Sequence, residues 1–292
     1  MSIKWIVTDM DGTLLNSSER ITDRTREALI ACQKKGIRLI LASGRSYVRL
    51  LPYAEQLEMK NYEGCFIEIN GLALNQLETQ KRTVFSALER KDIDCLFPVL
   101  EQFQVEIQGY EDDTLYYWIP EWQIPLKQKE CAEKGYGPEH PLVAGAWSWV
   151  TENIHNYPNL VPIASRTELP DRLNKLNCTD REEKIQGVYE YLTTHFGSKY
   201  EFVRTGPRLI EIAPQGITKG QTLRRFMEME GVSPDEVIVF GDGENDVDMF
   251  RCVKHSVAMG NAKNYVKKFA SDVTLSNDEE GVADALEKYH VL

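Results

Sequence analysis

The fold is decided by residues 4–14, which read Lys-Trp-Ile-Val-Thr-Asp-Met-Asp-Gly-Thr-Leu. The first five are mostly apolar or β-branched, and this predicts a short buried strand. Asp9 and Asp11 follow at its carboxyl end, the edge at which open parallel α/β sheets bind ligands. Two neighbouring carboxylates repel each other unless a cation lies between them or one is protonated. The stretch therefore indicates a divalent-cation or phosphoryl-transfer site, with a solvated acidic turn as the alternative.

The composition is that of an acidic globular protein. Its 292 residues include 34 Lys and Arg against 45 Asp and Glu, a net charge of −11, which argues against nucleic acid or an anionic membrane as the main partner. The six cysteines are scattered without a Cys-x-x-Cys pair, which is typical of reduced thiols. With no apolar run of membrane-spanning length and no signal-peptide pattern, we expect a cytoplasmic protein. The negative net charge leaves an anionic small substrate open, because a metal and a few cations can reverse the local field. The composition sets no oligomeric state.

Strands and helices alternate in the first part of the chain. After the strand before Asp9, a helix is expected at residues 22–35, a strand at 37–42, a helix at about 46–58 and a strand at 65–69. This β-α-β-α-β order favours a parallel sheet with helices on both faces. The same alternation returns in the last part of the chain.

Residues 84–208 have a different character. Strands cluster there with fewer helices, and residues 120–170 read as irregular because they are rich in Pro, Gly and aromatic side chains. This pattern predicts a separate α+β unit with an antiparallel sheet. We therefore predict an α/β, Rossmann-like parallel-sheet core, made of residues 1–83 and 209–292, that is interrupted by an inserted α+β domain at 84–208.

A second acidic cluster, Gly-Asp-Gly-Glu-Asn-Asp at residues 241–246, follows an apolar strand at 236–240. Its last position is Asp246 and not Gly, which excludes the dinucleotide-binding fingerprint. The cluster is either an acidic turn that caps the next helix or a second group of site residues at the edge that carries Asp9.

Two further signals involve phosphate-binding chemistry. Ser43, Gly44 and Arg45 follow the strand at 37–42 and precede a helix, where a hydroxyl and free backbone N–H groups can hold a phosphate; a plain helix cap is the alternative. Lys219 opens a helix, where a cation is electrostatically disfavoured, so it either has an anion nearby or is a solvated surface lysine. Together with the acidic clusters, these residues supply what phosphoryl transfer needs.

The order of these signals resembles the four motifs of the haloacid dehalogenase (HAD) superfamily. The motifs are Asp9-x-Asp11-Gly-Thr-Leu, Ser43-Gly-Arg, Lys219 and Gly241-Asp-Gly-x-Asn245-Asp246. The insertion between the second and third motifs resembles that of the Cof-type branch, as do Asn70-Gly71 and residues 209–214. The resemblance implies a HAD-like core with a class IIB cap domain at residues 84–208.

The resemblance also implies a mechanism. In this mechanism a phosphoric monoester hydrolase cleaves small phosphorylated metabolites, which the resemblance predicts to be sugar phosphates, through an aspartyl-phosphate intermediate. Asp9 would be the nucleophile, and Asp11 would protonate the leaving alcohol and then deprotonate the attacking water. Mg²⁺ would be held by Asp9, the backbone carbonyl of Asp11 and Asp242, with Asp246 in or near the coordination shell.

The substrate would be held by the remaining motif residues. The resemblance implies that Ser43, the N–H of Gly44 and Arg45 bind the phosphoryl group, that Lys219 neutralises charge, and that Asn245 orients the phosphate or the lysine. Two alternatives stay open: a phosphosugar mutase or phosphotransferase on the same scaffold, and a binding regulator without turnover. The aromatic residues of the stretch 110–160 either stack on a sugar ring or, as we favour, fill the core of the inserted domain or a dimer contact.

Overall fold

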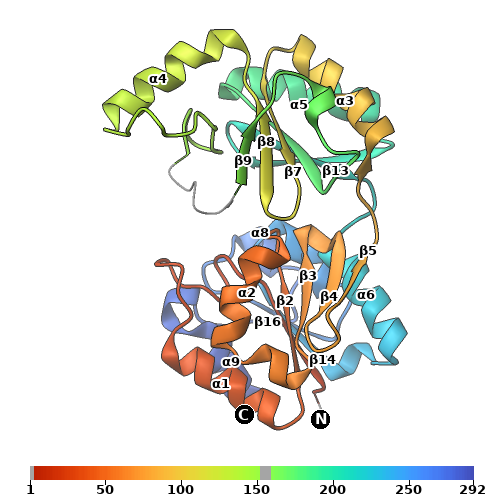
Figure 1. Cartoon of the computed structure of the whole chain (residues 1–292). Helices are drawn as coiled ribbons and strands as arrows, with labels where there is room; N and C mark the ends of the chain where they lie inside the picture. The colour runs from red at the N-terminus through yellow and green to blue at the C-terminus, as the bar shows by residue number, and fades with distance from the viewer. Residues whose placement is uncertain (1–2, 152–158) are drawn as a thin grey trace. The chain divides into compact units, whose positions relative to one another are not determined.

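The computed structural model describes residues 3–151 and 159–292 (Figure 1). Residues 152–158, which belong to the aromatic stretch, lie outside the described residues. The chain divides into two compact units: a core unit of Met1–Phe85 with Ile217–Leu292, and an inserted unit of Ser86–Gly216. The predicted fold class, an α/β parallel-sheet core with an inserted α+β domain, is confirmed.

The core unit is built on an eight-stranded sheet with the order β16-β15-β14-β1-β2-β3-β4-β5. The strands are β1 (Trp5–Thr8), β2 (Arg38–Ala42), β3 (Cys65–Glu68), β4 (Ala73–Gln76), β5 (Lys81–Val84), β14 (Val237–Gly241), β15 (His255–Ala258) and β16 (Asp272–Val273). The strands from β16 to β3 are parallel, and β4 and β5 continue the sheet antiparallel. Parallel strands that are covered on both faces need apolar residues on both sides, which explains the continuous apolar runs in the sequence.

Helices cover both faces of this sheet (Figure 1). One face carries α1 (Asp23–Lys34), α2 (Tyr47–Gln56) and α9 (Gly281–Lys288); the other carries α6 (Lys219–Glu230), α7 (Val247–Phe250) and α8 (Asn264–Lys267). Within β1, Ile6 packs into the first cluster and Trp5 and Val7 into the second. Because the faces are filled, the residues that follow the strands at the carboxyl edge are those free to form a site.

The inserted unit contains a six-stranded sheet with the order β12-β13-β11-β7-β8-β9. Its strands are β7 (Glu106–Tyr110), β8 (Thr114–Trp118), β9 (Asn159–Pro162), β11 (Lys175–Thr179), β12 (Tyr200–Gly206) and β13 (Leu209–Pro214); β6 (Leu88–Glu89) and β10 (Arg172–Leu173) form a separate pair. All neighbours in the larger sheet are antiparallel except β8 and β9. The helices α3 (Arg90–Gln102) and α5 (Glu182–Phe196) share one apolar cluster with the sheet, which makes this unit a true α+β domain.

The inserted unit differs from its sequence-based outline in two places. Its second boundary lies at Gly216 and not before residue 209, because β13 pairs with β11 and β12 of the insertion. Residues 120–170 are not irregular throughout, since they form α4 (Ile124–Glu133) and β9. Pro125 is compatible with α4 because the first helical turn has no intrahelical use for its missing N–H.

The aromatic stretch contributes packing within the inserted unit. The rings of Trp122 and Trp149 meet edge to face at 5.9 Å between centroids, and the guanidinium of Arg208 lies 3.8 Å from the Trp149 ring. Trp147, in contrast, is 78% exposed. Across the described parts of the chain, no helix has the combined length and apolar character needed to span a membrane.

Candidate active site

Three of the predicted motifs meet at the carboxyl edge of the core sheet. Asp9 directly follows β1, Asp242 follows β14 and Ser43 follows β2, and these strands are neighbours in the sheet. The ladder between β1 and β14 continues to the site, because the N–H of Asp9 donates to the carbonyl of Phe240 at 3.0 Å. The backbone of the two acidic motifs is therefore fixed by the sheet itself.

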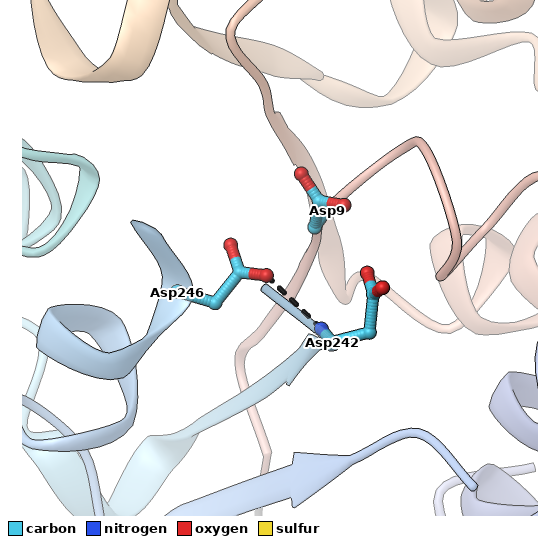
Figure 2. A group of neighbouring side chains, drawn as sticks. All are labelled: Asp9, Asp242 and Asp246. Carbon is cyan, nitrogen blue, oxygen red and sulfur yellow. Dashed lines mark hydrogen bonds between the residues drawn. The ribbon is translucent and has the colours of Figure 1, made fainter. Parts of the chain in front are cut away.

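Asp9, Asp242 and Asp246 form a carboxylate cluster (Figure 2). Each offers one oxygen, and these oxygens lie within 4.8 Å of one another. Burial, followed by the charge of Asp246, raises the pKa of Asp9 to about 8, and burial raises the pKa of Asp242 to about 6. A bound divalent cation relieves this repulsion, and carboxylate oxygens are the ligands that Mg²⁺ prefers. The donor set therefore fits a hard divalent cation.

Asp246 has both carboxylate oxygens engaged. Its Oδ2 accepts the N–H groups of Asp242 and Gly243 at 3.0 and 2.9 Å, and its Oδ1 accepts a hydrogen bond from Lys219 Nζ at 2.8 Å. These bonds shape the turn after β14 and aim the lysine. Asp246 thus supports the cluster, whereas Asp9 and Asp242 each have one carboxylate oxygen that accepts no hydrogen bond from a described residue.

Lys219 is the buried cation of the site. It is the first residue of α6, whose N-cap Thr218 accepts the N–H of Gln221 at 3.1 Å. Its Nζ donates to Asp9 Oδ1 at 2.5 Å as well as to Asp246. Burial opposes the lysine charge, but the Asp246 and Asp9 carboxylates outweigh it and raise the lysine pKa. The anion expected next to this helix start is therefore a pair of carboxylates.

The turn after β1 packs closely against Asp242. Thr13 Oγ1 donates to Asp242 Oδ1 at 2.8 Å. Gly12 has a φ of 80°, and a Cβ at this position would lie 2.5 Å from Asp242 Oδ2. Any other residue would be strained and would also collide with the carboxylate. Glycine is therefore required here for both conformation and space.

The Ser43-Gly44-Arg45 loop leaves one backbone donor open. The N–H of Ser43 bonds to the carbonyl of Ile67 at 2.9 Å, and that of Arg45 to Ser43 Oγ at 3.1 Å. Among the described residues, the N–H of Gly44 has no hydrogen-bond acceptor. The helix α2 begins only at Tyr47, so this donor belongs to a loop and not to the first helical turn. An unpaired N–H beside the carboxylate cluster is suited to hold an anionic oxygen.

Arg45 binds Asp11 in this structure. Its guanidinium donates to both carboxylate oxygens of Asp11, with Nε 2.9 Å from Oδ2, and its Nη1 donates to Tyr53 Oη at 3.2 Å. The Asp11 side chain is 56% exposed and is not one of the three clustered carboxylates. The resemblance predicts that Arg45 binds the substrate, and nothing in the sequence indicates that Tyr53 contacts Arg45.

Asn245 connects the site to a residue that the sequence analysis gave no role. Its Nδ2 donates to Asn70 Oδ1 at 3.0 Å. Asn70 follows β3, the strand next to β2. The Asn-Gly pair at this point is a turn signal, and its place at the end of a parallel strand could have marked it as a site residue.

A parallel sheet that gathers carboxylates, a buried lysine and an open N–H at one edge has the equipment of a phosphoryl-transfer enzyme. The family of haloacid dehalogenase-like hydrolases matches residues 6–286. The chain belongs to this family, as its motifs predicted.

Individual relatives extend over the whole chain. It is 31% identical over 292 residues to the 5-amino-6-(5-phospho-D-ribitylamino)uracil phosphatase YbjI of Escherichia coli, covering 99% of this chain and 96% of the relative. It is 28% identical over 297 residues to the chloroplastic endoribonuclease YBEY of Arabidopsis thaliana, but this match spans 98% of the chain and only 46% of that protein. A crystal structure of a haloacid dehalogenase-like hydrolase from Bacteroides thetaiotaomicron superposes with a TM-score of 0.81 at 30% identity, covering 99% of this chain and 100% of the other. Several relatives are named phosphatases, and the predicted enzyme class, a phosphatase, is confirmed.

Proposed function

We propose that the protein is a Mg²⁺-dependent phosphatase of small phosphorylated metabolites that works through an aspartyl-phosphate on Asp9. The observation that carries this proposal is the buried contact of Lys219 with both Asp9 and Asp246, beside the carboxylate of Asp242. A structural lysine needs only one carboxylate partner, whereas an anionic nucleophile that attacks an anionic phosphate needs concentrated positive charge around it.

Asp9 serves as the nucleophile. Its Oδ1 is held by Lys219, and Oδ2 is left to form the bond to phosphorus. As that bond forms, the bond from phosphorus to the ester oxygen breaks, and the ester oxygen takes a proton and leaves as an alcohol. In the second step water attacks phosphorus, its proton goes to a base, and the bond to Asp9 breaks to release inorganic phosphate.

Asp11 serves as the acid in the first step and as the base in the second. In this structure both carboxylate oxygens of Asp11 accept hydrogen bonds from the guanidinium of Arg45. The Asp11 side chain therefore has to leave Arg45 and turn towards the ester oxygen before the first step. That movement also frees the guanidinium of Arg45 to bind the phosphoryl group, the role that the family resemblance implies.

Asp9, Asp242 and the backbone carbonyl of Asp11 would hold Mg²⁺. Asp246 would support them through its hydrogen bonds with Lys219 and with the N–H groups of Asp242 and Gly243. When bound, the ion supplies charge neutralisation between the nucleophile and the phosphate. The chain's own contribution to phosphate binding is the hydroxyl of Ser43, the N–H of Gly44 and the charge of Lys219. Each of these groups can donate a hydrogen bond to a phosphoryl oxygen, and the positive charge of Lys219 favours an anionic ligand.

The test is release of inorganic phosphate from a panel of monoesters, with Mg²⁺ and with EDTA. The panel contains hexose 1- and 6-phosphates, pyridoxal 5′-phosphate, 5-amino-6-(5-phospho-D-ribitylamino)uracil and p-nitrophenyl phosphate. We expect Mg²⁺-dependent release, with sugar phosphates among the best substrates. Isomerised hexose phosphate without inorganic phosphate would identify a mutase, and tight binding of an ester without turnover would identify a regulator; both would overturn the proposal.

We place the protein in the cytoplasm. All six cysteines are free, and Cys65 and Cys178, whose thiol pKa values are raised by burial, lie inside the two units. Free thiols are the normal state in a reducing compartment.

A further inference from the structure

The turn that follows β3 has an unusual backbone. Ile69 and Asn70 have φ angles of 50° and 53°, and Gly71 follows with a φ of 100°. Left-handed backbone is tolerated by asparagine and glycine, but for a β-branched residue such as isoleucine it is an outlier. Such conformations are energetically unfavourable and persist where the surrounding structure fixes them, often at functional sites.

This turn is fixed by contacts with two catalytic motifs. The N–H groups of Ile69 and Asn70 donate to the carbonyls of Arg45 and Ser43 at 3.1 and 2.9 Å. Gly71 lies against the start of α6, since a Cβ there would be 2.3 Å from the carbonyl oxygen of Thr218. The N–H groups of the strained turn therefore hold the loop through the carbonyls of Ser43 and Arg45, and these contacts do not use the N–H of Gly44.

The side chain of Asn70 lies over that loop. A methyl group on Gly44 would be 3.4 Å from both Nδ2 and Oδ1 of Asn70. Oδ1 is occupied, because it accepts the hydrogen bond from Asn245. The two protons on Asn70 Nδ2 remain, and no residue that the structure describes accepts them. An oriented donor thus lies beside the open N–H of Gly44.

Asn70 lies at the same edge of the sheet as the other site residues. Asp242, Asp9 and Ser43 directly follow the adjacent parallel strands β14, β1 and β2, and β3, which precedes Asn70, is the next strand in the sheet. The proposed substrate carries a phosphoryl group with three peripheral oxygens, each able to accept more than one hydrogen bond. The donors proposed above are those of Ser43, Gly44, Arg45 and Lys219. The phosphoryl oxygens can still accept a hydrogen bond from a further neutral donor at this edge.

We propose that Asn70 is a substrate-binding residue, whose Nδ2 donates to a phosphoryl oxygen held at Gly44, and that Asn245 orients it. This inference rests on the proposed function of the site. It gives Asn245 a positioning role through Asn70, which uses one of the two protons on Asn245 Nδ2.

The variant Asn70→Gly separates this role from a structural one. Glycine adopts left-handed backbone at least as easily as asparagine, so the turn is kept while the amide is lost. We expect the melting temperature of this variant to stay within a few degrees of the parent. The KM for the best monoester and the inhibition constant for orthovanadate, a phosphate analogue, should each rise about tenfold to hundredfold, which is the range for loss of a hydrogen bond to a charged group. Gln80→Gly is the matched control, since Gln80 also has a left-handed φ of 53° but lies exposed in the β4–β5 turn. Its kinetic constants should not change.

A second variant, Asn70→Asp, keeps the shape and the left-handed preference but replaces the donor with a negative charge. It should bind phosphate more weakly than Asn70→Gly, because a carboxylate then faces the phosphoryl oxygens. Calorimetric binding of inorganic phosphate in Mg²⁺ is measured for all four proteins. If the parent hydrolyses esters and both Asn70 variants keep its KM and phosphate affinity, the inference is overturned while the proposed function stands. If the parent binds phosphate without turnover and Asn70→Gly loses that binding, the inference holds and the proposed function fails; a parent that neither binds nor hydrolyses overturns both.

Discussion

Replacement of Lys219 by methionine tests the electrostatic design of the site directly. Lys219 Nζ lies 2.5 and 2.8 Å from Asp9 and Asp246. With an effective dielectric constant of about 20, the two attractions are about 7 and 6 kcal/mol. Desolvation of the lysine offsets much of this, and removing one partner of a buried ion pair costs about 3–5 kcal/mol net. A domain of this size loses about 2–4 °C of melting temperature per kcal/mol, so we expect a fall of roughly 10 °C.

The assay is thermal unfolding in EDTA at pH 5.5 and pH 8, together with phosphate release. Without its counter-charge Asp9 binds a proton more tightly in the folded variant, and a folded state that binds protons more tightly gains stability as the pH falls. The deficit relative to the parent should therefore be larger at pH 8 than at pH 5.5, and turnover should fall at least about a thousandfold at both.

The matched control is Lys288→Met. Lys288 also lies 2.8 Å from an aspartate, Asp284, but its side chain is 58% exposed, against 0% for Lys219. Exposed pairs contribute only about 0.2–1 kcal/mol, so this variant should melt within about 3 °C of the parent. Equal losses in the two variants, or an unchanged melting temperature in Lys219→Met, would refute the reasoning.

Three further predictions concern the carboxylates. Asp9→Asn should lower turnover by a factor of about 10⁴ or more without lowering the melting temperature, because it removes the nucleophile and a buried charge together; steady-state kinetics showing full activity would exclude the covalent mechanism. Asp242→Ala should raise the Mg²⁺ concentration for half-maximal activity at least about tenfold, because an anionic ligand is lost, and an identical Mg²⁺ titration would remove Asp242 from the metal site. In the parent, calorimetric Mg²⁺ affinity should increase from pH 6 to pH 8, since protons on Asp242 (pKa about 6) and Asp9 (pKa about 8) compete with the ion; a pH-independent affinity would contradict this.

The sequence predicted those parts of the site that follow from strand ends. Asp9, Ser43 and Asp242 directly follow apolar strands, and the carboxyl ends of parallel strands meet at one edge. Lys219 was placed by a local argument of the same kind, since a cation at a helix start needs an anion. These positions depend on regular backbone, which local patterns specify well.

Other features depend on irregular backbone or on side-chain rotation, and local patterns do not encode them. The contact between Asn70 and Asn245 exists because Ile69 adopts a left-handed conformation that its own preferences oppose. The pairing of Arg45 with Asp11 reflects one rotamer of each. In the inserted unit, α4 was missed because its neighbourhood is rich in Pro, Gly and aromatic residues, although residues 126–133 themselves are ordinary helix formers.

The interrupted core also determines the order in which the molecule can be built on the ribosome. Trp5 of β1 pairs with Val237 of β14, and at about 5–20 residues per second the second partner follows the first by roughly 10–50 s. During this interval β1, β2 and β3 can pair with one another, and the inserted unit can fold, but one flank of β1 stays open. Asp9 can meet Lys219 only after β13 has been made, and it can meet both Asp242 and Asp246 only after residue 246 has emerged. The carboxylate cluster therefore forms late in synthesis, and shorter nascent chains lack it.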